Sequence, residues 1–179
     1  MGMTITILGI AGSLRGESFN RRLLAAARHE LPPGAELAVW DDLAAVPPFD
    51  EDAEEAPGEA VTGLRKAVAE TRAVLIATPE YNNSLPGQLK NALDWASRPY
   101  GAGVLTGKPA GVIGASPGPR GAVTAQADAR RVLAAAGALV VPGEVAVGDA
   151  VRRFDERGRL LDHDLRTALA DLLKALVGA

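Results

Sequence analysis

Short apolar segments alternate along the chain with longer segments in which apolar residues recur every three or four positions. The short segments have strand length and cover residues 4–10, 36–40, 73–78, 110–115 and 138–141. Those at 4–10, 73–78 and 110–115 are apolar runs with β-branched residues, as is typical of strands buried on both faces. The pattern predicts five strands, three of them inside a sheet.

The longer segments have the spacing of amphipathic helices. Their apolar faces fall within residues 20–31, 61–68, 85–96, 123–136 and 165–176, and Asp162 or Asp164 would cap the last of them. Strands that alternate strictly with helices predict a parallel sheet with helices on both faces, a three-layer α/β sandwich. Ligands of such sheets bind beyond the carboxyl ends of the strands. The loops at residues 11–19, 79–86 and 116–121 are therefore the candidate binding loops.

Two stretches lack a regular pattern. Residues 41–58 are rich in proline and acidic residues, and we interpret them as a solvated connection in preference to a lid or an interface arm. Residues 145–158 contain the turn sequence Asp155-Glu156-Arg157-Gly158, which suggests a small extension of the fifth strand.

Length and charge narrow the class of protein. The 179 residues fit one α/β domain spanning 1–179, and 47% apolar residues suffice for its core. The net charge is −3. The chain has no basic stripe with interleaved aromatic residues, so its charge pattern does not favour nucleic-acid binding. No apolar run is long enough to cross a membrane, and the N-terminus lacks the basic leading region of a signal peptide.

Cysteine is absent, which excludes disulfides, thiolate nucleophiles and Cys-ligated metals. The two histidines, His29 and His163, are far apart in the sequence, so we expect no metal site. A chain without cysteine fits a reducing compartment, and the expected location is cytoplasmic.

The loop after the first strand is rich in hydroxyl groups but matches neither of two common phosphate loops. A Walker A loop needs a lysine where this chain has Glu17, between Gly16 and Ser18. The Rossmann pattern needs two glycines two positions apart, whereas Gly9 and Gly12 are three apart. An NTPase and a dinucleotide-binding Rossmann site are both disfavoured.

What remains in this loop suits a terminal phosphate monoester bound without magnesium. Ser13 and Ser18 offer hydroxyls, Asn20 an amide and Arg15 a guanidinium, and the start of the following helix adds backbone N–H groups. The alternative is that Ser18 only caps the helix and Arg15 is solvated.

The loop after the third strand is stiffened at both ends by Pro79 and Pro86. Between them, Asn82, Asn83 and Ser84 supply amide and hydroxyl groups that can contact the polar edge of a flat heterocycle. Pro86 and its neighbour Gly87 are expected in the first turn of the next helix. The alternative is a capped turn from strand to helix in which Tyr81 only packs.

Together these two loops resemble the NADPH-dependent FMN reductase family, which includes bacterial quinone, chromate and azo reductases. The first motif is Gly-Ser-Leu-Arg at 12–15 with Ser18 and Asn20. The second is Pro-Glu-Tyr-Asn at 79–82, followed by Pro-Gly at 86–87 and Leu-Lys-Asn-Ala-Leu-Asp-Trp at 89–95. The segments at 97–99 and 154–156 continue the likeness. The resemblance implies a flavodoxin-like fold with strand order 2-1-3-4-5 and FMN at the switch point of that order.

The resemblance also implies roles for individual residues. The FMN phosphate would be held by Ser13, Arg15, Ser18 and Asn20. The ring would be lined by Pro79, Glu80, Tyr81 and Asn82, with Ser84 in the same loop, while Ser116 and Gly118 would border the ring or the ribityl chain. Pro117 and Pro119 depart from the family, in which this third loop commonly has flexible Gly-rich residues.

Family members are usually dimeric or tetrameric, which implies a homodimer or homotetramer with subunits that meet near the flavin. Trp95, Arg98 and the stretch 41–58 are the candidate contacts. No residue in the sequence decides whether the protein prefers NADH or NADPH, because Arg15, Arg98 and Arg120 are all candidates for contact with a ribose phosphate.

A rival signal lies in the third loop, where residues 114–118 match the Gly-x-Ser-x-Gly motif of serine hydrolases. Asp149 and His163 follow Ser116 in the matching chain order. The oxyanion hole of that motif needs the backbone N–H of the next residue, which here is Pro117. Because losing one such donor costs about a hundredfold in rate, a hydrolase is disfavoured.

The expected activity is an NAD(P)H-dependent oxidoreductase with FMN as its redox group. Hydride would pass from NADH or NADPH to the flavin, and a small acceptor such as a quinone, chromate, an azo compound or free flavin would then take the electrons, a ping-pong scheme. No protein residue is needed as a catalytic acid or base, and Glu80 and Tyr81 are expected to position the flavin. The alternatives are an FMN-binding electron carrier or sensor without turnover of its own, and an interaction domain without a cofactor.

Overall fold

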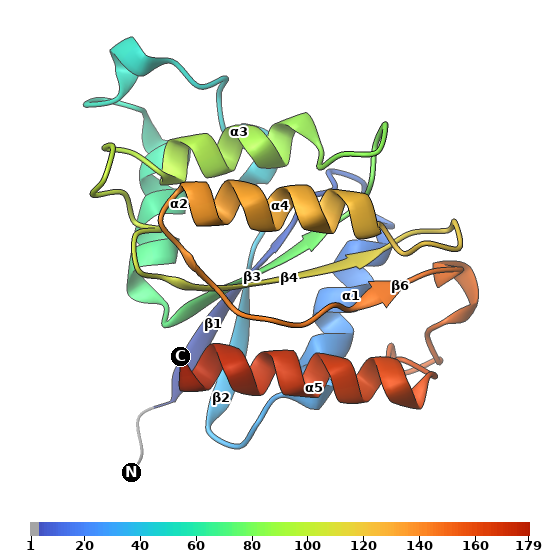
Figure 1. The fold of residues 1–179 in the computed structure, drawn as a ribbon. Helices are drawn as coiled ribbons and strands as arrows, with labels where there is room; N and C mark the ends of the chain where they lie inside the picture. Colours follow the sequence, from blue (N-terminus) through green and yellow to red (C-terminus); the bar gives the residue numbers. More distant parts are fainter. Residues whose placement is uncertain (1–3) are drawn as a thin grey trace.

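A parallel sheet forms the middle layer of the computed structural model, which describes residues 4–179 (Figure 1). Its strands are β1 (Ile5–Ala11), β2 (Ala35–Trp40), β3 (Ala73–Thr78), β4 (Pro109–Ala115), β5 (Leu139–Val140) and β6 (Ala146–Val147). They are arranged in the order β2-β1-β3-β4-β5, and β6 also pairs with β4. The predicted flavodoxin-like order 2-1-3-4-5 is confirmed.

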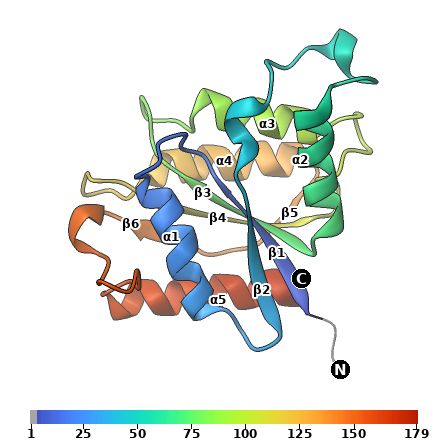
Figure 2. The same ribbon diagram turned by 180° about the vertical axis from the view of Figure 1, so that it is seen from behind.

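The helices form two outer layers. Figures 1 and 2 show α1 (Phe19–Ala27) and α5 (His163–Gly178) on one face of the sheet, and α2 (Glu59–Glu70), α3 (Gly87–Ala96) and α4 (Val123–Ala135) on the other. Short 3-10 helices lie between these elements: η1 (Arg28–Glu30), η2 (Asp42–Ala45), η3 (Glu51–Ala53) and η4 (Ala150–Arg152). Among the described residues, no helix combines the length and apolar character needed to cross a membrane.

Successive residues of the central strands point into different cores, as the pleat requires. Ile7 and Leu75 face α1 and α5, whereas Leu8 and Ile76 face the other helical layer. All four side chains are buried. This burial on both faces explains the uninterrupted apolar runs of β1 and β3.

The fifth position of the sheet is filled by two short strands. β5 pairs with the start of β4 and β6 with its end, so the predicted extension takes the form of a second contact with the same strand. The guanidinium of Arg130 on α4 bridges the interruption, because it donates to the carbonyl oxygens of Val112 at 3.1 Å and Gly143 at 2.7 Å. A carbonyl of β4 that lacks a strand partner is satisfied in this way.

Side chains define several helix starts. Ser18 caps α1 and Asp162 caps α5, each by accepting from two backbone N–H groups of the first turn. Pro86 occupies the N-cap of α3, one position earlier than predicted, and Gly87 is the first helical residue. Helix α4 has no cap of its own, because Ala122 stands at its N-cap in the left-handed region with φ 62°.

Candidate functional site

Three loops meet beyond the carboxyl ends of β1, β3 and β4, at the edge seen on the right in Figure 1. The chain leaves β1 for β2 on one side and returns to β3 on the other side, so the switch point of strand order lies between β1 and β3. A cavity of about 180 Å³ opens there. It is lined by Ser13, Arg15, Ser18, Phe19, Asn20, Pro79, Glu80, Tyr81, Ala115, Ser116 and Pro117.

Most of the residues predicted to bind the cofactor are therefore brought together around one cavity. Asn82, Ser84 and Gly118 are not in its lining. A second cavity of about 380 Å³ adjoins the first and shares Arg15 and Tyr81 with it. The rest of its lining is Gly12, Leu14, Pro86, Gly87 and Gln88.

Leu14 and Gln88 had no binding role assigned from the sequence. Leu14 is 53% exposed and Tyr81 is 49% exposed, so the second cavity has two bare, largely apolar walls. Their positions in the sequence could have indicated a binding role, because Leu14 lies inside the first motif and Gln88 directly follows Pro-Gly of the second.

The first loop presents a set of unused donors. Within residues 4–179, the backbone N–H groups of Leu14, Gly16, Glu17 and Phe19 donate to no protein acceptor. The hydroxyl of Ser13 accepts from Arg15 N at 3.3 Å, and the hydroxyl of Ser18 accepts from Asn20 N at 3.1 Å. Each hydroxyl still has its proton to donate, so capping by Ser18 and anion binding are compatible. This donor set fits a phosphate dianion.

Asn20 connects two layers of the site. Its amide nitrogen donates to the carbonyl of Ala115 at 3.0 Å, and its amide oxygen accepts from Ala115 N at 2.9 Å. The side chain is buried, so both bonds are shielded from water. Asn20 thus ties the start of α1 to the end of β4. Any contact with a phosphate rests on its one remaining N–H.

The second loop contains a tight turn from Tyr81 to Ser84. Tyr81 and Ser84 exchange two backbone hydrogen bonds of 3.0 and 3.1 Å, and Asn82 and Asn83 both have positive φ, 51° and 60°. These are the features of a type I′ turn, in which asparagine is favoured. Within residues 4–179 the backbone N–H groups of Asn82 and Asn83 donate to no acceptor, so both remain free for a ligand.

Glu80 joins the second loop to α4. Its Oε2 atom accepts from Thr124 N at 3.0 Å and Ala125 N at 3.2 Å, and its Oε1 atom lies 3.7 Å from Arg120 Nη2. The carboxylate is 13% exposed and serves as the cap that α4 lacks. Ser84 adds a second link through a 2.7 Å bond to Asp128. Both side chains position the loop.

The third loop is fixed to β6 and to the segment that follows it. Ser116 N donates to Val147 O, Asp149 N donates to Gly118 O and Ala150 N donates to Ser116 O, at 3.0 to 3.1 Å. Gly148 permits this approach, because a Cβ atom there would lie 2.1 Å from the carbonyl oxygen of Pro119. The two prolines therefore belong to a loop that is held rigidly along its length.

The geometry also argues against the serine hydrolase motif. The hydroxyl of Ser116 accepts from Gly118 N at 3.1 Å, and Ser116 is not among the described residues with positive φ that mark a strained elbow. His163 is exposed in the first turn of α5. Nothing in this arrangement activates the hydroxyl.

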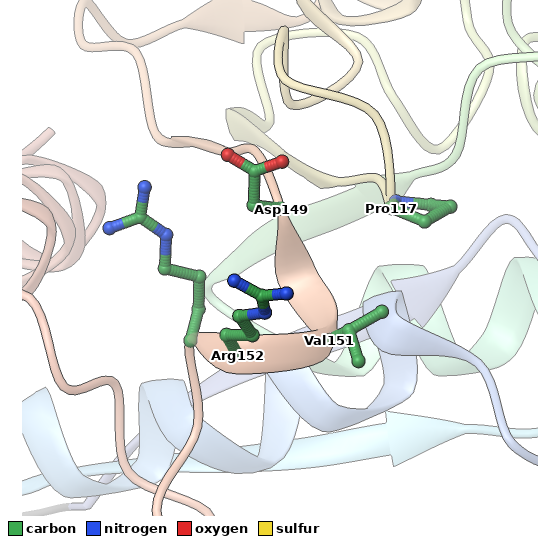
Figure 3. Close-up of a pocket in the computed structure, with 5 residues that line it drawn as sticks. Pro117, Asp149, Val151 and Arg152 are labelled. Carbon is green, nitrogen blue, oxygen red and sulfur yellow. The ribbon is translucent and has the colours of Figure 1, made fainter.

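Next to the third loop lies a hollow of about 590 Å³ (Figure 3). It is lined by Pro117, Asp149, Val151, Arg152 and Arg153, and Pro117 also lines the cavity at the switch point. The hollow and the cavity are therefore neighbours. None of the residues from 149 to 153 was expected to be part of a site, except Asp149 in the rejected hydrolase triad.

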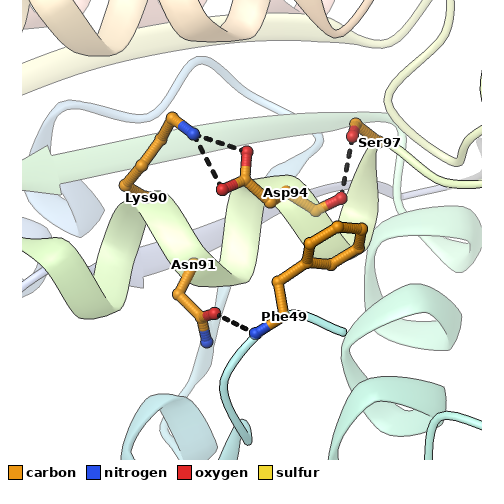
Figure 4. A network of polar contacts seen from close by, with 5 residues as sticks. All are labelled: Phe49, Lys90, Asn91, Asp94 and Ser97. Atoms are coloured by element: carbon orange, nitrogen blue, oxygen red, sulfur yellow. Dashed lines mark hydrogen bonds and ion pairs between the residues drawn. The ribbon is translucent and has the colours of Figure 1, made fainter. Parts of the chain in front are cut away.

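The stretch 41–58 is attached to α3 (Figure 4). Asn91 accepts from Phe49 N at 2.7 Å and donates to Pro47 O at 2.8 Å, and Trp95 Nε1 donates to the same carbonyl at 2.9 Å. The Phe49 and Trp95 rings pack edge to face with centroids 4.9 Å apart. The interpretation of 41–58 as a solvated connection is wrong for Leu43 and Val46, which are buried, and for Phe49, which packs on Trp95. Trp95 is 1% exposed, so its predicted contact with a partner subunit is also wrong.

The fold and the site together define the class of protein: a flavodoxin-like α/β protein with a binding site at the switch point of its sheet. Residues 5–152 match the model of the NADPH-dependent FMN reductase family, and the chain belongs to this family. The predicted family, fold and enzyme class, with FMN and a nicotinamide dinucleotide as cofactors, are confirmed at the level of the family.

Individual relatives agree with this assignment. The chain is 41% identical over 180 residues to an NAD(P)H-dependent FMN reductase of Pseudomonas aeruginosa, covering 98% of this chain and 95% of that protein. It is 37% identical over 168 residues to a 2-hydroxy-1,4-benzoquinone reductase of a Burkholderia species, covering 93% and 91%. The solved structure of FerB, a flavoenzyme NAD(P)H:(acceptor) oxidoreductase from Paracoccus denitrificans, superposes with a TM-score of 0.87 at 31% identity over 98% of both chains.

Proposed function

We propose that this chain is an NAD(P)H-dependent FMN reductase that reduces quinones and similar small acceptors by a ping-pong scheme. The observation that carries the proposal is the pair of adjoining cavities at the switch point. The first cavity is bordered by N–H and O–H groups that are free to donate to a phosphate. The second is bordered by the exposed side chains of Leu14 and Tyr81. The 2-hydroxy-1,4-benzoquinone reductase among the relatives supports a quinone as the acceptor.

In this proposal the first loop binds the phosphate of FMN. Ser13 and Ser18 donate their hydroxyl protons, the unused backbone N–H groups of Leu14, Gly16, Glu17 and Phe19 add donors, and Arg15 supplies the opposite charge. Asn20 maintains the cavity through its bonds to Ala115 and adds its remaining N–H. No magnesium ion is needed, because the donor set itself supplies the charge and the hydrogen bonds.

The second and third loops hold the flavin ring and the ribityl chain. Pro79, Glu80 and Tyr81 form one wall through their backbone, Asn82 donates its N–H to the ring edge, and Ser84 fixes the turn. Ser116 and Gly118 border the ribityl chain. Bound FMN supplies the hydride acceptor and two-electron donor. The oriented N–H groups of the turn stabilise negative charge at that position.

No side chain is required as a catalytic acid or base. The carboxylate of Glu80 is committed to two backbone N–H groups of α4, which leaves it the positioning role. Leu14 and Tyr81 provide the open surface against which first the nicotinamide and then the acceptor lies. Such an apolar surface suits flat quinones, and we extend the proposal to chromate, azo compounds and free flavin.

We further propose that residues 1–179 act as one FMN-binding domain in the cytoplasm, assembled as a homodimer or homotetramer. With Trp95 buried, the remaining contact candidates are Arg98 and the stretch 41–58. Tyr100 is 88% exposed beside Arg98, at 5.9 Å from the ring centroid to the guanidinium carbon, and adds apolar surface to the same region.

A single preparation tests the proposed activity. The flavin content is measured first, and NADH and NADPH oxidation is then followed with a panel of quinones. We expect a yellow protein that turns over without any partner protein. A colourless protein that does not gain flavin absorbance on addition of FMN contradicts the cofactor site. A flavin-loaded protein that fails to oxidise either nicotinamide is an electron carrier or sensor, not a reductase.

A further inference from the structure

The hollow next to the third loop combines an apolar wall with two guanidinium groups and one carboxylate. Val151, which is 65% exposed, and Pro117 form the apolar part. Arg152, Arg153 and Asp149 supply the charges. Figure 3 labels Arg152 and Asp149 among the side chains that line the hollow. Its volume of about 590 Å³ is in the range of sites for small ligands.

The two arginines are held differently. Arg153 donates from Nε to Gly148 O at 3.1 Å and from Nη1 to Asp162 at 3.3 Å, so it is part of the local scaffold. Arg152 forms no side-chain hydrogen bond or ion pair with any residue from 4 to 179. An exposed guanidinium without a partner, at the wall of a hollow, is free to bind an anion.

The backbone around Arg152 is rigid. The N–H groups of Asp149 and Ala150 donate to the third loop, and Arg152 N donates to Asp149 O at 3.0 Å. Asp149 itself has φ 50°, a conformation that non-glycine residues adopt at a cost and that concentrates at binding sites. Asp149 also lines the hollow, and its carboxylate is an acceptor for a sugar hydroxyl.

The other arginines considered for a ribose phosphate are engaged elsewhere. Arg120 lies 3.4 Å from Asn83 Oδ1 and 3.7 Å from Glu80 Oε1, and Arg98 lies over the rings of Phe49 and Tyr100. Arg15 lines both cavities of the proposed flavin site. Arg152 is the free guanidinium of the neighbouring hollow.

We propose that the hollow binds a ribose phosphate of the nicotinamide dinucleotide, with Arg152 on the phosphate and Asp149 on a ribose hydroxyl. This inference rests on the proposed function, since it adds a subsite to that active site. The position fits, because Pro117 borders both the hollow and the proposed flavin cavity. A dinucleotide whose nicotinamide lies at the flavin can then extend along the third loop.

The test compares Arg152→Ala, Arg152→Lys and a matched control, Arg157→Ala, in FMN-loaded protein. Arg157 is an exposed arginine outside the hollow. We expect Arg152→Ala to raise the KM for NADPH about tenfold with kcat within about twofold, because one charge-assisted contact is lost. Arg152→Lys should recover part of the loss, and Arg157→Ala should match the unmodified protein.

NADH identifies which phosphate is bound. If only the KM for NADPH rises, the hollow holds the 2′-phosphate; if both rise equally, it holds the pyrophosphate. Either result supports the subsite, whereas unchanged KM values for both nicotinamides overturn it.

A binding measurement separates this inference from the proposed activity. Adenosine 2′,5′-bisphosphate and ADP are titrated into the same FMN-loaded proteins by calorimetry. If the unmodified protein shows no turnover but binds either nucleotide about tenfold more tightly than Arg152→Ala does, the subsite stands and the proposed activity fails. If turnover is normal but neither KM value nor nucleotide affinity depends on Arg152, the subsite fails alone.

Discussion

The carboxylate of Glu80 accepts a 3.0 Å hydrogen bond from the backbone N–H of Thr124. A residue of the second binding loop therefore caps α4, the helix that follows the third loop. Helix α4 depends on this bond because Ala122, at its own N-cap, has no side-chain acceptor. The same bond, together with the bond from Ser84 to Asp128, links the turn from Tyr81 to Ser84 to α4.

Glu80→Ala is therefore expected to weaken both folding and cofactor binding. Loss of a helix cap costs about 1 kcal/mol of the free energy of unfolding, and the affinity for FMN should fall as the loop loses its anchor. Glu80→Gln retains an acceptor oxygen and should lose less. Urea unfolding of the apoprotein and FMN titration measure the two effects. An unchanged FMN affinity in Glu80→Ala would mean that the loop is positioned without this bond.

Ser18 allows capping and phosphate binding to be separated. Asp and Asn cap helices about as well as Ser, so Ser18→Asp and Ser18→Asn should keep the free energy of unfolding of the apoprotein within about 1 kcal/mol. A carboxylate at this position repels a phosphate dianion, so only Ser18→Asp should reduce FMN affinity strongly, by about tenfold or more. Fluorescence titration of FMN gives the comparison. Equal FMN affinity in the two variants would show that no phosphate lies at Ser18.

The parts of this site that could be predicted from the sequence are local. The apolar run of β3 and the Pro-Glu-Tyr-Asn segment after it are contiguous, and the alternation of strands and helices brings the two motifs to the same edge. The positive φ of Asn82 and Asn83 also follows from residue type, since asparagine tolerates the left-handed region.

The parts that could not be predicted depend on contacts between distant residues. Asn20 bonds to Ala115, which is 95 positions away, and Glu80 reaches α4 across 44 positions. Trp95 matches a family motif and was expected at an interface, yet it is buried in its own chain against Val46, Phe49 and Val61. No periodicity encodes these pairings, because each requires the finished sheet to bring its partners together.

Arg130 provides a test of the divided fifth strand. Its guanidinium is half-buried and bonds to Val112 O and Gly143 O, and burial lowers its pKa. Arg130→Met should cost about 1–3 kcal/mol of the free energy of unfolding, because two backbone carbonyls lose their donor. The neighbouring Arg131→Ala is the control. Its pair with Asp128 is exposed at 3.6 Å, so it should change the free energy by less than about 1 kcal/mol. Equal stability of the two variants would show that water replaces Arg130 without cost.

Trp95 and Asn91 test whether residues 43–49 are held by α3 or only lie against it. Both side chains donate to Pro47 O, so each single variant, Trp95→Phe or Asn91→Ala, leaves that carbonyl one donor. The double variant leaves none, and its loss of stability should exceed the sum of the single losses by about 1 kcal/mol.

Proteolysis locates the effect of the same variants. The double variant should be cleaved within residues 41–58 well before the rest of the chain, since the segment loses its bonds to α3 while the sheet keeps its own. The assembly state, measured by light scattering, should remain that of the unmodified protein in Trp95→Phe, because the buried indole contacts only its own chain. Dissociation of the assembly in Trp95→Phe would place this segment at a subunit contact that depends on the indole.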